Sequence, residues 1–163
     1  MSNFETFVVP YDFSSHSRAA LAMAVDLAQR FASQLHLVHV IQPATLYYVP
    51  YGGPPTTAAG PAAILELREI AEKALREVAA SVERECGRVE THVVESASIP
   101  DAIHEVAAKV AADLIVMGTH GRTGLAHVFL GSVAERMLRR APCPVLTVQA
   151  HEGDEAAANA RRG

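Results

Sequence analysis

The sequence predicts a single α/β domain built on a parallel sheet with helices on both faces. Five short apolar runs, rich in β-branched residues, are separated by longer segments, and four of these segments repeat apolar residues every three or four positions. Parallel strands need long crossover connections, which helices supply. This alternation is therefore typical of a doubly wound sheet of five parallel strands.

The first part of the chain is expected to form a strand, a helix and a second strand. Residues 4–10 are an apolar run closed by a proline, and residues 34–41 are a second apolar run, so both are expected as buried strands. Between them, serines that can cap a helix precede apolar residues at helical spacing as far as residue 32. Residues 42–61 hold five of the nine prolines and three of the four tyrosines, which predicts a long loop. This loop is either a lid or partner-binding segment, or an ordinary surface loop.

The middle of the chain predicts a long amphipathic helix over residues 62–86, with Gly87 just past its end. A strand over residues 89–95 and a helix that starts near Ser98 follow. The apolar side of the long helix is expected to consist of Ile64, Leu67, Ala71, Leu75, Val78, Val82 and Cys86.

The last part predicts a strand over residues 113–117, a helix over 128–140 and a final strand over 145–149. The domain is expected to span residues 1–150. Residues 151–163 contain no large apolar residue and are expected to form a disordered polar tail. The expected core contacts of the last helix are Val133, Met137 and Leu138.

Composition and charge exclude several classes of protein. The formal net charge is −4, and the chain has no clustered basic face of the kind that general nucleic-acid binding needs. No apolar run approaches the roughly 18 residues of a membrane span, and the first residues lack the features of a signal peptide. Cys86 and Cys143 stand far apart and form no C-x-x-C pair. We therefore expect a cytoplasmic protein with reduced cysteines and no membrane or nucleic-acid partner.

The turn after the fourth predicted strand is the strongest candidate for a site. Ligands of doubly wound sheets bind at the carboxyl ends of the strands, and here four glycines fall within 14 residues, followed by Ser132 at a helix start. Glycines let backbone amides approach an anion, and the helix N-terminus adds a favourable dipole. The alternative is a turn that uses its glycines only to bend. The spacing matches neither G-x-x-x-x-G-K-[ST] nor G-x-G-x-x-G, which argues against a P-loop NTPase and a dinucleotide dehydrogenase.

The histidines do not predict a metal site. His36 and His39 are three apart on one strand, so they point to opposite faces and cannot share an ion. His16 and His92 are scattered along the chain, and solvent or core roles are expected for them. Asp113 begins a strand at the end away from the predicted site and is expected to be structural.

The glycine spacing resembles a family motif. Gly118-x-x-Gly121, followed after nine residues by Gly131-Ser132, matches the G-x₂-G-x₉-G-[ST] motif of the universal stress protein family. FVVPYDFSSHSRAAL, LHLVHVI and the stretch from DLIVMGTHGRTG to CPVLTV also resemble that family, so the resemblance covers nearly the whole domain. It implies a Rossmann-like fold with strand order 3-2-1-4-5, a homodimer through the last strand (145–149), and ATP binding with Mg²⁺ or Mn²⁺.

The resemblance also implies which residues bind the nucleotide. Asp12 would lie by the ribose and phosphates and could hold the metal, although by chemistry alone it fits a turn or capping role equally well. Val40 would contact adenine through its backbone, and Tyr11 stands where family members often have a smaller residue. The implied nucleotide-binding residues are Pro10, Tyr11, Asp12, Val40, Met117, Gly118, His120, Gly121, Arg122, Gly131, Ser132 and Val133.

Three functions are consistent with these features. The first is an ATP-binding module that regulates a stress response and passes its occupancy to protein partners. The second is a slow ATPase, which is disfavoured because the sequence offers no convincing general base apart from Asp12. The third is a nucleotide-free dimeric interaction protein.

Overall fold

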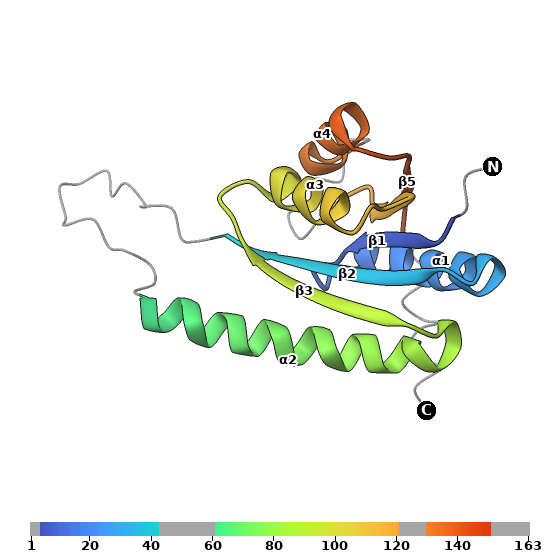
Figure 1. Ribbon diagram of the computed structural model, residues 1–163. Coiled ribbons are helices and arrows are strands. Elements are labelled where there is room, and N and C mark those ends of the chain that lie inside the picture. Colours follow the sequence, from blue (N-terminus) through green and yellow to red (C-terminus); the bar gives the residue numbers. More distant parts are fainter. Residues whose placement is uncertain (1–3, 43–60, 121–129, 151–163) are drawn as a thin grey trace.

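The computed structural model describes residues 4–42, 61–120 and 130–150, and these form five strands and four helices (Figure 1). The strands form one sheet with the order β3-β2-β1-β4-β5, and every pair of neighbours is parallel. The predicted fold class and the strand order implied by the family resemblance are thus confirmed. The strands are β1 (Thr6–Pro10), β2 (Gln34–Ile41), β3 (Val89–Glu95), β4 (Leu114–Gly118) and β5 (Val145–Val148). The helices are α1 (Ser15–Phe31), α2 (Pro61–Cys86), α3 (Ile99–Lys109) and α4 (Ser132–Arg140).

Both faces of the sheet are buried, because successive residues of the central strands point to opposite sides. In β1, Phe7 and Val9 pack with α1 and α2, whereas Val8 packs with α3 and α4. All three are fully buried, which explains why β1 is a continuous apolar run and does not alternate with polar residues. Figure 1 shows α2 on one side of β2 and β3, with α3 and α4 on the other side.

The helix ends follow the predicted caps. The Ser17 N–H donates to the hydroxyl of Ser14 at 3.2 Å, and the Asp101 N–H donates to the hydroxyl of Ser98 at 3.4 Å. Gly87 has φ +89° just past α2, and its N–H donates to the Glu83 carbonyl at 2.9 Å. A residue with a side chain would be strained in that left-handed conformation.

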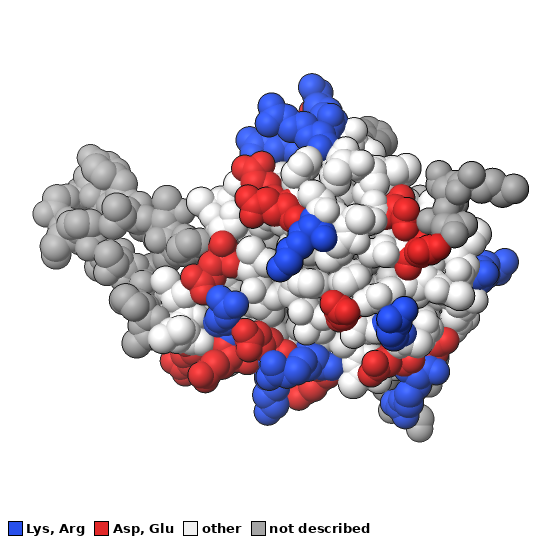
Figure 2. All heavy atoms as spheres, in the orientation of Figure 1, with Lys and Arg blue, Asp and Glu red and all other residues white. Residues whose placement is uncertain are grey.

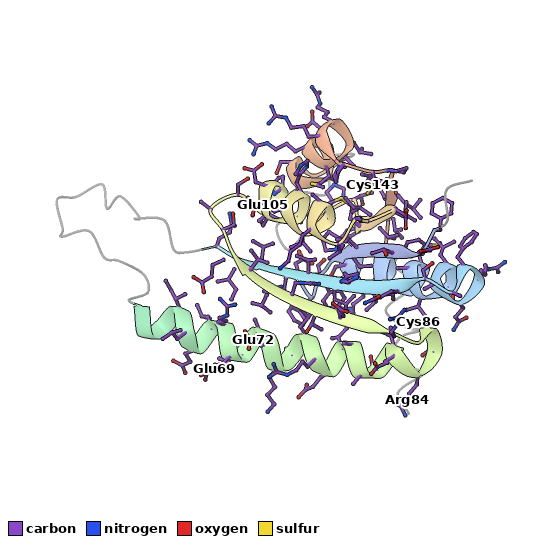
Figure 3. All side chains as sticks on the ribbon, in the orientation of Figure 1. Glu69, Glu72, Arg84, Cys86, Glu105 and Cys143 are labelled. Atoms are coloured by element: carbon purple, nitrogen blue, oxygen red, sulfur yellow. The ribbon has the colours of Figure 1, made fainter. Side chains whose placement is uncertain are left out.

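Asp113 has the structural role expected of it. Its Oδ2 accepts the backbone N–H of Glu5 at 2.9 Å and that of Thr6 at 3.0 Å, which ties the start of β1 to the start of β4. The two cysteines are free thiols on different layers of the fold, one at the end of α2 and the other beside α4 (Figure 3). None of the described helices combines the length and the apolar character that crossing a membrane requires.

The edge strand β3 is covered by charged side chains of α2. Arg68 donates to Glu72 Oε1 at 3.0 Å, to Glu95 Oε1 at 3.1 Å and to the Val93 carbonyl at 3.4 Å. Figure 2 shows acidic and basic side chains interspersed over this part of the surface. The ion pairs and the carbonyl contact therefore place charge along the outer side of β3.

Three predictions about helices are wrong. The last helix was expected from residue 128, but α4 begins at Ser132 because Gly131 has an extended backbone and its N–H donates to the Thr119 carbonyl at 2.8 Å. Leu138 is 50% exposed, since the short α4 buries only Ala134 and Met137 fully. On α2, Leu67 is also 50% exposed and does not lie in the core. The predicted tail lies outside the described residues, as does the loop predicted over 42–61 except for its two end residues.

Substitution of Leu75 tests whether packing in the core holds α2 in place. The leucine side chain is fully buried in the cluster shared by α1, α2 and the sheet, so Leu75→Ala should lower the free energy of unfolding by about 2–5 kcal/mol. Leu65→Ala is the matched control, because Leu65 is 61% exposed on the same helix and its loss should cost about 0.5 kcal/mol or less. Urea denaturation of both variants measures the difference. Equal losses would contradict this packing of α2.

Candidate functional site

A cleft of about 930 Å³ opens at the carboxyl ends of β1, β2 and β4 and reaches the N-terminus of α4. Ten of the twelve residues that the family resemblance implied for the site lie in the described part of the chain, and all ten line this cleft. Gly121 and Arg122 lie outside the described residues. The ten are Pro10, Tyr11, Asp12, Val40, Met117, Gly118, His120, Gly131, Ser132 and Val133.

Asp12 organises the turn that leaves β1. Its Oδ1 accepts the backbone N–H of Ser14 at 3.1 Å and the Ser14 hydroxyl at 2.5 Å, while the same hydroxyl caps α1. Phe13 between them has φ +66°, and the Arg18 guanidinium donates to its carbonyl at 2.6 Å. The turn role that chemistry alone allowed for Asp12 is therefore present, and it fixes the carboxylate at the rim of the cleft. A ligand role for Asp12 stays a prediction.

Tyr11 contributes its ring to the core beside the cleft. The residue is 6% exposed, and its ring meets that of Phe13 edge to face with centroids 5.1 Å apart. Its carbonyl accepts the Nδ1–H of His39 at 2.7 Å, and its N–H donates to the Val38 carbonyl at 2.8 Å. The large Tyr11 side chain is thus accommodated in the core, at a position where family members often have a smaller residue.

Gly118 ends β4 where the first turn of α1 passes closest. A Cβ at this position would lie 2.8 Å from the Cβ of His16 and 2.9 Å from its carbonyl carbon, and such contacts require the backbone to move. The glycine therefore serves close packing of α1 against β4, which is a different role from supplying an amide to an anion. Both roles are compatible, because Gly118 lines the cleft as well as contacting His16.

Gly131 places the start of α4 at the cleft. Its N–H bond to the Thr119 carbonyl brings it back beside the end of β4, and a Cβ there would meet that oxygen at 3.0 Å. Among the described residues no side chain caps α4, while Ser132 and Val133 line the cleft. The amides of a first helical turn have no partner within the helix, so this end of the cleft favours an anionic group.

The other end of the cleft is apolar. Ile99 and Ile103 of α3 and Leu67 and Ile70 of α2 line it together with Val40. Leu67 and Ile70 are 50% and 59% exposed, so α2 presents apolar surface at the cleft. The sequence did not indicate these four residues, because their pattern on the helices is the ordinary pattern of core positions. The cleft as a whole fits a ligand with an apolar part and an anionic part.

His16 and His120 form a pair beside the end of the cleft that favours an anionic group. Their ring centroids are 5.2 Å apart, and His16 Nδ1 accepts the N–H of Ala150 at 3.1 Å. Partial burial lowers the pKa of His16, the neighbouring His120 lowers it further, and the Asp12 carboxylate opposes both effects. The neutral ring is the form that accepts from Ala150, so the lowered pKa and the hydrogen bond agree.

The chain was compared with known proteins. The model of the family described as "Universal stress protein family" matches residues 3–149. "Universal stress protein MJ0531" of Methanocaldococcus jannaschii is 34% identical over 146 residues, which cover 90% of this chain and 82% of the relative. A universal stress protein of Thermus aquaticus is 34% identical over 148 residues, covering 90% of this chain and 99% of the relative.

Solved structures agree with the sequence comparisons. The universal stress protein UspA from Lactobacillus plantarum superimposes with a TM-score of 0.75 at 25% identity, covering 91% of this chain and 99% of the other. A universal stress protein crystallised in complex with cAMP superimposes with a TM-score of 0.57 at 26% identity, covering 92% and 100% of the two chains.

The lowered pKa of His16 predicts how stability changes with pH. Because the unfolded chain protonates this histidine near pH 6.5 and the folded chain resists protonation, the free energy of unfolding should fall as the pH drops below about 6.5. His36 and His92 also have lowered pKa values and act in the same direction. His16→Asn keeps an acceptor for Ala150 but cannot be protonated, so its stability should fall less between about pH 7.5 and 5.5. Urea denaturation across this range checks the slope, and an unchanged slope in the variant would contradict the assignment to His16.

Proposed function

The chain belongs to the universal stress protein family, and on that premise we propose that it is an ATP-binding module that regulates a stress response through nucleotide occupancy. The observation that carries the proposal is the cleft, which has at one end the start of α4, where no described side chain forms a cap, and an apolar wall at the other. Phosphates suit the first end and a purine ring suits the second. The relative crystallised with cAMP is an adenine nucleotide complex in the same family.

The proposed binding mode assigns each end of the cleft a part of ATP. The glycine turn and the first amides of α4, at Ser132 and Val133, bind the phosphates, while Gly131 positions this turn through its bond to the Thr119 carbonyl. Val40 and the apolar side chains around it contact adenine. Asp12 lines the same cleft, and its carboxylate is assigned to the ribose or the metal.

Mg²⁺ fits this donor set. It is a hard cation that prefers oxygen ligands and is usually bound by one or two carboxylates together with substrate phosphates. Asp12 offers a carboxylate that the Ser14 contacts hold in place at the polar end of the cleft. When bound, the ion would neutralise phosphate charge.

Occupancy, and not turnover, is the proposed signal. Among the cleft residues that the structure describes, the carboxylate and imidazole groups that could act as a general base are those of Asp12, His39 and His120. Asp12 is engaged in its turn, His39 donates to the Tyr11 carbonyl, and His120 Nδ1 lies 3.1 Å from the Thr119 hydroxyl. Hydrolysis needs a positioned water and stabilisation of charge on the γ-phosphate, and this arrangement favours holding the nucleotide over activating water.

Asp12→Asn tests the metal-assisted part of the site. The amide oxygen can still accept from Ser14, so the turn should persist while the charge is lost. With Mg²⁺ present we expect ATP affinity to fall about 10- to 100-fold, and without Mg²⁺ to change much less. Isothermal titration of both forms measures this. Asp26→Asn is the control, because Asp26 is exposed on α1 away from the cleft and its loss should leave ATP binding unchanged. Wild-type protein that ignores ATP at millimolar concentration would contradict the proposal.

We further propose that two chains pair through β5. This strand is one of the two edges of the sheet, and edge strands offer unpaired backbone groups to another chain. Leu146 on β5 is 36% exposed, which leaves an apolar side chain for a partner to cover.

Leu146→Glu should convert the proposed dimer into a monomer, because it places a charge in the covered interface. Analytical ultracentrifugation of the folded variant measures the mass directly. Leu65→Glu makes the same change on an exposed position of α2 and should keep the wild-type mass. An unchanged mass for the β5 variant would place the interface elsewhere.

A further inference from the structure

A second group of polar side chains lies away from the cleft, where β2 runs beside the edge strand β3 (Figure 1). It consists of His36 on β2 and Glu90 and His92 on β3, and one ligand atom of each lies within 4.8 Å of the others. His36 belongs to the first half of β2, whereas the cleft is formed at the carboxyl ends of the strands. None of these three residues lines the cleft.

The pairing of β2 with β3 creates this group. Glu90 is the register partner of His36, and His92 is the partner of Val38, so the three side chains lie on the same face of the two strands. The expectation that His36 and His39 point to opposite faces is confirmed, since His39 instead contacts Tyr11 and Phe13. His92 was expected to have a solvent or core role, and the register of two strands brings its ring, 56 residues away in sequence, to within 3.0 Å of His36.

The distances suit a transition metal. His36 Nδ1 lies 3.0 Å from His92 Nε2 and 3.6 Å from Glu90 Oε2. A tetrahedral ion held at about 2.1 Å by nitrogen and oxygen ligands separates neighbouring ligand atoms by about 3.4 Å. The two observed separations lie on either side of that value, so small side-chain rotations would bring the three atoms to an ion.

The surroundings allow an ion to enter and to be held. His36 is 5% exposed and His92 is half-buried, whereas the side chain of Glu90 is 58% exposed and reaches solvent. Burial lowers the pKa of both imidazoles, which favours the neutral rings that bind metals, and Glu90 supplies a negative charge. Glu90 raises the pKa of His92, whereas the positive charge of Lys109 on α3 lowers it.

We propose that His36, Glu90 and His92 form a binding site for a divalent transition metal, with Zn²⁺ as the ion whose preferred ligands they match. Two imidazoles and one carboxylate leave a fourth tetrahedral position for water, on the exposed side of Glu90. A bound ion would join the edge strand β3 to β2 by coordination as well as by the backbone ladder. This site is independent of the proposed nucleotide site.

Metal titration of the full chain tests the site. After removal of metals with a chelator, wild-type protein should bind Zn²⁺ in isothermal titration, and Co²⁺ should give the intense visible bands of a four-coordinate ion. His92→Ala should weaken this binding by at least about tenfold and remove the Co²⁺ bands. His104→Ala is the control, because His104 is an exposed imidazole on α3 outside the group and its loss should change neither readout. Wild-type protein that binds no Zn²⁺, or a His92→Ala variant that binds it as wild type does, would overturn the proposal.

Glu90→Gln keeps the test decisive if a histidine variant fails to fold. Glu90 is exposed, so this variant should fold normally, as circular dichroism can verify, and should still lose at least about tenfold in Zn²⁺ affinity. Thermal unfolding gives a second readout: Zn²⁺ at about 100 times its Kd should raise the wild-type Tm by about 5–10 °C. Zn²⁺ at the same concentration should raise the Tm of Glu90→Gln by clearly less. Equal shifts in the two proteins would overturn the site.

Discussion

The close contact between Gly118 and His16 is the constraint on which the cleft depends. With 2.8 Å between a Cβ at position 118 and the Cβ of His16, any side chain there would push the first turn of α1 away from β4. That turn carries the Ser14 cap, and Ser14 in turn holds the carboxylate of Asp12. Gly131 plays a similar part at the start of α4, because its N–H bond to the Thr119 carbonyl returns the chain to the end of β4. Two positions without side chains thus bring the starts of two helices to one end of the sheet.

The rigidity of that end comes from burial on both faces of the strands. Phe7, Val8 and Val9 are fully buried on alternating sides, so β1 cannot shift without disturbing both helical layers. Polar groups that directly follow such a strand are held in a fixed position with it. This explains why the residues that could bind a ligand follow the strands directly, at Asp12 after β1 and at Thr119 and His120 after β4.

Sequence reasoning predicted the features that depend on local pattern. The strands, the caps at Ser14 and Ser98 and the glycine past α2 each follow from a few neighbouring residues. It failed where the answer depends on distant parts of the chain. Leu67 has the spacing of a core residue, yet it lines the cleft. Leu138 has the same spacing, but its helix is too short to bury it. His92 meets His36 only through strand register, which no local pattern contains. For the glycine turn, the motif indicated the place, and the structure added that Gly118 also serves packing.

The two edges of the sheet differ in a way that bears on assembly size. At β3, Arg68 contacts Glu95 and the Val93 carbonyl, so the outer edge carries charge and a covered acceptor, whereas β5 presents the partly exposed Leu146. If both edges accepted another chain, each added copy would expose a fresh edge and the sheet could lengthen into a fibre. With charge on one edge only, two copies joined at β5 would show β3 at both ends, and growth would stop. The asymmetry of a single sheet can therefore set the difference between a closed pair and an open polymer.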